Sequence, residues 1–137
     1  MLAITRDADR RRSPSPARRV LVIEPYASGR RAICACIVEL GHEALEVETL
    51  DAARILAASS GVDLVIAAWD DDDSRAVLDA LRAGDPELPT VVLSDCRPRV
   101  ATGPAGAMLL VKPFTLVSLE RAIELMARPR AAPIIRS

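Results

Sequence analysis

Short apolar runs alternate with amphipathic segments along most of this chain. Four predominantly apolar runs of strand length occur at residues 20–23, 63–69, 90–93 and 107–111. Between them, apolar residues recur at intervals of three and four, which is the period of a helix with one buried face. A weaker alternation at residues 43–48 is typical of a strand at the edge of a sheet. We therefore expect five strands connected by helices.

Each of the four expected helices has an inner apolar stripe. In chain order the stripes are Ile33, Cys36, Ile37 and Leu40; Ala52, Ile55, Leu56 and Ser59, after a Thr49 cap; Val77, Leu78 and Leu81; and Leu119, Ala122, Ile123 and Met126. Strands that are apolar on both faces are buried on both, as in a parallel sheet between two helical layers. The sequence thus predicts an α/β fold with a doubly wound, five-stranded parallel sheet.

The two ends of the chain lack this periodicity. Residues 1–18 contain three consecutive arginines and two Ser-Pro steps, and residues 129–137 contain two prolines. We expect two disordered tails around one domain at residues 19–128, with no output domain after it. Both ends are basic and the domain is acidic. Attraction of nucleic acid by the tails is one interpretation, which the absence of aromatic residues in them disfavours.

Composition excludes several other classes of protein. No apolar run approaches the ~18 residues that cross a bilayer, and no apolar segment follows the N-terminal arginines as in a secretory signal. The three cysteines, Cys34, Cys36 and Cys96, form no CxxC pair, and the chain has one histidine. A zinc site is therefore not expected, and the free thiols suit the reducing cytoplasm.

Polar side chains follow three of the predicted strands where each strand ends. These residues are Glu24, Ser94 and Lys112, whereas the third strand of the chain ends near Ala68. Functional groups of doubly wound folds collect at the carboxyl ends of the strands. We therefore expect these four positions to lie together at one edge of the sheet.

In this order of strands, helices and strand-end residues, the chain resembles the receiver domain of two-component response regulators over about residues 19–127. The segments that carry the resemblance are residues 20–24, 30–41, 63–68 and 88–94 and the Lys-Pro-Phe step at 112–114. It implies a flavodoxin-like sheet with the strand order 2-1-3-4-5. The fourth helix of the family is expected to be shortened or absent, because residues 95–106 contain two prolines and two glycines.

The resemblance also implies roles for the residues at the sheet edge. In this family an aspartate attacks a phosphoryl donor, while Mg²⁺ held by an acidic pair neutralises the phosphoryl oxygens. Glu24 matches the first acid of the pair, Ser94 the hydroxyl that binds the phosphoryl group, and Lys112 the lysine that pairs with it. Pro25 stands at the second acid and Ala68 at the phosphoacceptor. An alanine cannot attack phosphorus, so this pocket is expected to be degenerate. With one acid of the pair left, Mg²⁺ binding is expected to be weak or absent. Glu24 and Lys112 are then expected to form an ion pair.

The sequence thus predicts a non-enzymatic, phosphorylation-incompetent receiver that works in the cytoplasm through protein–protein contact. Its expected partner is a histidine kinase or another regulator, and a homodimer is a further option, with Leu116 and Leu125 as candidate surface residues. One alternative is that Asp70 serves as a non-standard phosphoacceptor. Two further residues of strand rise ~7 Å, which takes Asp70 out of reach of Lys112 unless the loop folds back. The other alternative is a nucleic-acid-associated protein that binds through its arginine-rich tails.

Overall fold

The structure is a computed structural model that describes residues 17–95 and 106–128, except for the side chains of residues 59 and 60. One parallel sheet has the strand order β2-β1-β3-β4-β5. Its strands are β1 (Arg19–Ile23), β2 (Glu43–Val47), β3 (Leu64–Ala68), β4 (Thr90–Ser94) and β5 (Met108–Val111). The helices between them are α2 (Ala27–Glu39), α3 (Leu50–Ser60), α4 (Asp72–Gly84) and α5 (Leu116–Met126). The predicted fold and strand order are confirmed.

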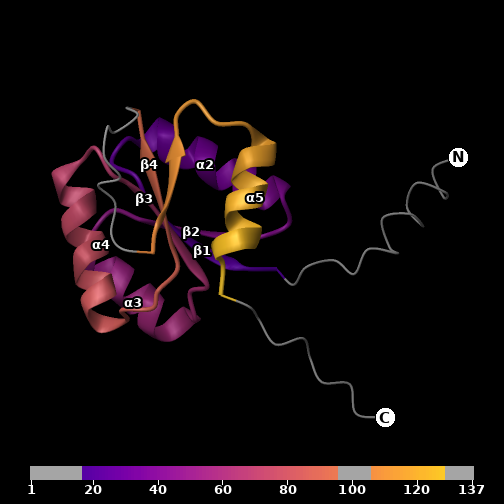
Figure 1. The fold of residues 1–137 in the computed structure, drawn as a ribbon. Helices are drawn as coiled ribbons and strands as arrows, with labels where there is room; N and C mark the ends of the chain where they lie inside the picture. The colour runs from indigo at the N-terminus through magenta and orange to yellow at the C-terminus, as the bar shows by residue number, and fades with distance from the viewer. Residues whose placement is uncertain (1–16, 96–105, 129–137) are drawn as a thin grey trace, which may run out of the picture.

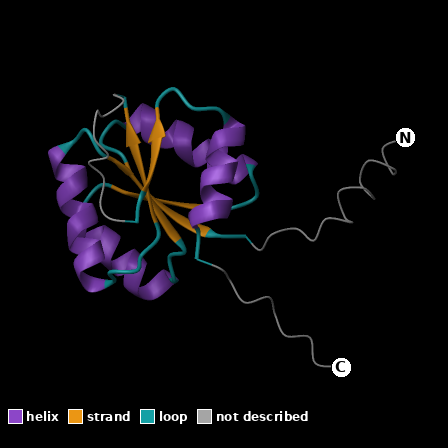
Figure 2. Cartoon of the chain, in the orientation of Figure 1, coloured by secondary structure: helices purple, strands orange, loops and turns teal. Residues whose placement is uncertain are grey.

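The helices form one layer on each side of the sheet (Figure 1, Figure 2), so the sheet divides the core into two clusters. Ile37 of α2 and Ile123 of α5 belong to the first cluster, together with Ile66 of β3. Leu78 of α4 belongs to the second cluster, together with Val65 of β3. Successive residues of β3 thus enter opposite clusters, as the alternation of side chains along a strand requires.

Two predictions about burial are wrong in detail. Ile55 was expected on the inner face of α3 but is 66% exposed, whereas Ala53 is fully buried. Ala53 belongs to the second core cluster. The predicted Thr49 cap is confirmed, because its hydroxyl oxygen accepts a hydrogen bond from the Ala52 amide at 3.1 Å. Strand β5 contacts both core clusters but is only half-buried, because it is an edge strand of the described sheet.

Several predictions fall on residues outside the described ones. The segment in which the fourth helix is expected to be shortened or absent lies mainly in residues 96–105, and the expected tails lie mainly in residues 1–16 and 129–137. The domain boundaries therefore stay predictions. None of the helices in the described residues has the length and apolar character that crossing a bilayer requires.

Candidate functional site

The strand register brings the predicted residues to one edge of the sheet. Ala68 pairs with Leu93 across β3 and β4, so it lies beside the strand end that carries Ser94. Glu24 follows β1 and Lys112 follows β5 at the same edge. Ala68 is the last residue of β3 and is only 6% exposed.

Glu24 and Lys112 form the ion pair that the sequence predicts. The Lys112 Nζ atom lies 3.6 Å from Glu24 Oε1. Glu24 is 4% exposed, and its second oxygen, Oε2, has no hydrogen-bond partner in the described part of the chain. Gly29 gives this carboxylate room, since a Cβ atom at that position would lie 3.3 Å from Glu24 Oε1. The Lys112–Pro113 peptide bond is cis.

Arg30 is a buried part of this edge that the sequence reasoning missed. Its guanidinium donates from Nη1 to the Glu24 carbonyl oxygen at 2.9 Å and from Nη2 to Glu48 Oε1 at 2.8 Å. The residue precedes Ile33 by three positions and Ile37 by seven, so it lies on the inner stripe of α2. That spacing is the signal that could have identified it. A fixed cation thus lies beside the backbone of Glu24.

Pro25 and the acidic run offer little to a bound ion. Pro25 is exposed and lines a cavity of about 360 Å³ together with Glu24, Arg30 and Asp71. Asp71 caps α4, because its Oδ2 atom accepts hydrogen bonds from the amide of Ser74 at 2.8 Å and from its hydroxyl at 2.9 Å. Negative charge at this helix terminus complements the helix dipole. Among the described residues, no three His, Cys, Asp or Glu side chains are grouped in a way that could hold a metal ion.

Asp70 folds back onto the site. The chain bends immediately after β3, and the Ser94 hydroxyl donates to Asp70 Oδ1 at 2.8 Å. The backbone amide of Asp95 donates to Asp70 Oδ2 at 2.7 Å. The pKa of Asp70 is lowered chiefly by this amide, and also by the Ser94 hydroxyl and the positive charge of Lys112, although slight burial opposes the shift. The loop after β3 therefore folds back, as the Asp70 alternative requires. Asp70 binds the Ser94 hydroxyl, and the positive charge of Lys112 acts on it.

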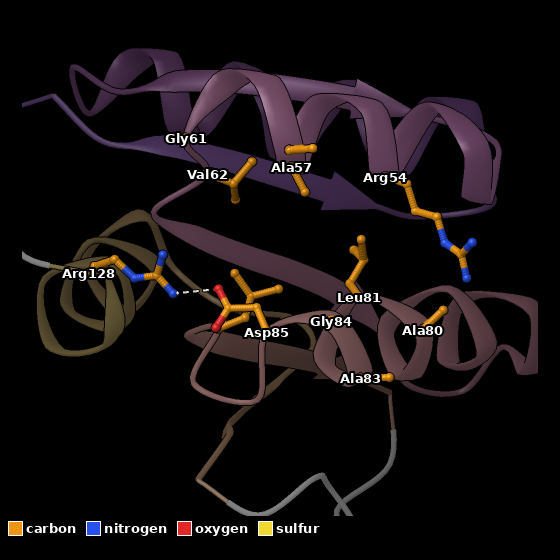
Figure 3. A pocket seen from close by; sticks show the side chains of 12 residues that line it. Arg54, Ala57, Gly61, Val62, Ala80, Leu81, Ala83, Gly84, Asp85 and Arg128 are labelled. Atoms are coloured by element: carbon orange, nitrogen blue, oxygen red, sulfur yellow. Dashed lines mark hydrogen bonds and ion pairs between the residues drawn. The ribbon is translucent and has the colours of Figure 1, made fainter.

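A larger cavity lies at the opposite end of the sheet. It encloses about 580 Å³ between α3 and α4 and is lined mainly by small apolar side chains (Figure 3). An ion pair between Arg128 Nη2 and Asp85 Oδ2, 2.8 Å apart, lies at one end of it. None of the predicted site residues lines this cavity, so cavity size does not mark the site.

Comparisons with known proteins identify the fold. A scan against protein-family models and a search of the curated proteins both find no match. A response regulator from Thermotoga maritima is 19% identical, with a TM-score of 0.63 over 80% of this chain and 96% of that one. The chemotaxis protein CheY4 of Vibrio cholerae is 18% identical, with a TM-score of 0.67 over 80% of this chain and 98% of that one.

A third solved structure is only partly covered. The anti-anti-sigma factor PhyR of Bartonella quintana is 20% identical, with a TM-score of 0.68 over 88% of this chain and 51% of that one. Identities this low speak for the fold and not for the chemistry of the site. The described part of the chain therefore has the fold of the receiver domains of response regulators.

Proposed function

We propose that this chain is a receiver-like module of two-component signalling that takes no phosphoryl group at the usual position and acts by binding another protein. The observation that carries the proposal is Ala68, which ends β3 at the sheet edge between Glu24 and Ser94. A methyl group has no lone pair with which to attack phosphorus. The acid and the lysine of the pocket are engaged with each other instead.

The same residues do not suit Mg²⁺. This ion prefers near-ideal octahedral oxygen ligation and several carboxylate or water oxygens. At this edge Glu24 Oε1 faces the Lys112 ammonium, Pro25 has no side-chain oxygen, and Asp71 is engaged at the terminus of α4. One buried oxygen of Glu24 is a poor basis for a metal site.

The surface of α5 supports a role in protein contact. Leu116, Val117 and Leu125 are 41%, 62% and 69% exposed, and we call these three residues the α5 patch. Val117 and Leu125 also line a hollow of about 390 Å³ beside β5. Exposed aliphatic side chains that gather beside an apolar hollow are typical of an interaction surface. Affinity at such a surface depends on complementarity and not on a phosphoryl switch.

Phosphoryl transfer provides the first test. The purified chain is incubated with acetyl phosphate and Mg²⁺, and its intact mass is measured. We expect no gain of a phosphoryl group. A gain that survives the Asp70→Ala substitution would contradict both this proposal and the alternative that follows.

Phosphorylation of Asp70 is a second candidate, favoured by the contacts of that carboxylate with Ser94 and the field of Lys112. If Asp70 is an acceptor, acetyl phosphate adds one phosphoryl group to the wild type and none to Asp70→Ala. An Asp73→Ala variant, which removes a charge from the same acidic run, would still gain it. The three masses distinguish this candidate from the first.

Partner binding provides the second test. A histidine kinase or regulator of the same organism is titrated with the wild type, with Leu125→Arg and with Ile55→Arg as the matched control. Ile55 is also an exposed aliphatic side chain, but it lies on α3. We expect binding to be lost in Leu125→Arg alone and to be unaffected by acetyl phosphate. Binding that requires acetyl phosphate would refute the proposal.

A further inference from the structure

One carboxylate receives two hydrogen bonds at the end of β4. The Ser94 hydroxyl and the Asp95 amide belong to consecutive residues, and each donates to a different oxygen of Asp70. The two donor–acceptor distances, 2.8 Å and 2.7 Å, are those of good hydrogen bonds to a charged group. The two donors converge on a single anion.

The strands hold both donors in place. Ser94 is the last residue of β4 and is 3% exposed, so its position is fixed by the sheet. Its carbonyl oxygen accepts a hydrogen bond from the Lys112 amide at 2.8 Å, which joins the end of β4 to the start of the Lys112–Pro113 step. The Lys112 ammonium also acts electrostatically on Asp70. A hydroxyl and a backbone amide thus bind one negative charge, and the charges of Lys112 and Arg75 also favour it.

We propose that Asp70 is an internal latch whose carboxylate occupies a binding site for tetrahedral oxyanions formed by the Ser94 hydroxyl and the Asp95 amide, in the electrostatic field of Lys112. This inference rests on the proposed function, in which no phosphoryl group is formed at the end of β3. The donors match such an anion chemically, because phosphate oxygens accept hydrogen bonds from hydroxyl and backbone N–H groups and pair with lysine. In this chain the anion is supplied by the protein itself.

The latch has a structural effect at the junction of Ser94 and Asp95. Because Asp70 binds the Ser94 hydroxyl and the Asp95 amide, the loop after β3 orients these two groups without a phosphoryl donor. The junction is then held in one arrangement at all times. This is the behaviour that a module with constant partner affinity needs.

Opening the latch is the decisive experiment. In Asp70→Ala the two donors lose their acceptor, and added inorganic phosphate can take its place. The backbone amide signal of Asp95 is followed by NMR during phosphate titration in buffer free of Mg²⁺. We expect a saturable shift in Asp70→Ala with an affinity at least tenfold higher than in the wild type.

Two variants make the result specific. Asp73→Ala removes the same charge from an exposed position in the first turn of α4, and it should bind phosphate no better than the wild type. Asp70→Ala combined with Ser94→Ala should lose most of the gained affinity. The latch is overturned if Asp70→Ala gains no affinity, if Asp73→Ala gains as much, or if loss of the Ser94 hydroxyl changes nothing.

A measurement on the wild type covers the case in which Asp70→Ala does not fold. The latch requires the Asp95 amide to be hydrogen-bonded, so its hydrogen exchange should be at least tenfold slower than in an unstructured peptide. Exchange at the unprotected rate would overturn the proposal. Neither result depends on acetyl phosphate, so failure of the latch and failure of the proposed function are read from different experiments.

Discussion

Removal of the Lys112 ammonium should destabilise the protein through Glu24. At 3.6 Å and an effective dielectric constant of about 20, two unit charges attract each other by about 5 kcal/mol. The Lys112 side chain is 30% exposed, and solvent screens part of this attraction. We expect Lys112→Met to lower the free energy of unfolding by about 2–3 kcal/mol near neutral pH, because it leaves a buried carboxylate without compensation.

Glu24→Gln should be the milder change, because Lys112 can turn its ammonium to solvent. Its expected cost is about 1 kcal/mol. The double variant is the informative one. Once Lys112 is methionine, Glu24→Gln removes the uncompensated charge and should restore about 1–2 kcal/mol of stability. The sign of the Glu24→Gln effect thus reverses between the two backgrounds.

Urea unfolding followed by far-ultraviolet circular dichroism measures all four proteins of this cycle. Equal denaturant slopes would show that the differences lie in stability and not in the extent of unfolding. The reasoning is refuted if the double variant is less stable than Lys112→Met by the full cost of Glu24→Gln. Additive costs would mean that the two charges do not interact.

Three further predictions follow from individual contacts. Burial chiefly, and also the charge of Arg18, lowers the pKa of His42. The His42 Nδ1 atom accepts a hydrogen bond from the Arg18 backbone amide at 3.0 Å. The unfolded chain therefore binds the proton first, and urea titrations should show stability falling as the pH drops below 6.5, an effect absent in His42→Gln. Burial chiefly raises the pKa of the Cys34 thiol to about 11, so peptide mapping should find its alkylation near pH 8 more than tenfold slower in the folded than in the urea-unfolded chain. Thr115→Ala removes the capping box that Thr115 forms with Ser118 at the start of α5, and thermal melts should reveal a loss of about 1 kcal/mol.

The strands were predictable from the sequence because burial on two faces leaves a plain apolar run. The same run marks where each strand ends, and the edge residues Glu24, Ser94 and Lys112 follow from that. Their ion pair was predictable too, since opposite charges that end strands at the same edge of a parallel sheet lie close enough to attract each other. The pattern of apolar runs was sufficient to predict these three residues of the site.

The pattern could not supply the phase of α3 or the path of the chain after β3. Ile55 and Ala53 differ by about half a turn, and which of them faces the sheet depends on where the helix begins and how closely it packs. Asp70 reaches Ser94 because the Trp69 amide bonds to the Leu93 carbonyl at 2.8 Å and the chain then bends. A single backbone turn decides this contact, and hydrophobic periodicity does not encode it.

The division of the core by the sheet has a consequence for spectroscopy. The sole tryptophan, Trp69, packs against the cluster under α3 and α4, with the Arg75 guanidinium carbon 5.1 Å from the ring centroid. The emission of Trp69 therefore reports on unfolding of that half of the molecule, and it is insensitive to unfolding confined to α2 and α5. A melt in which emission and ellipticity do not coincide would reveal two halves that come apart at different temperatures.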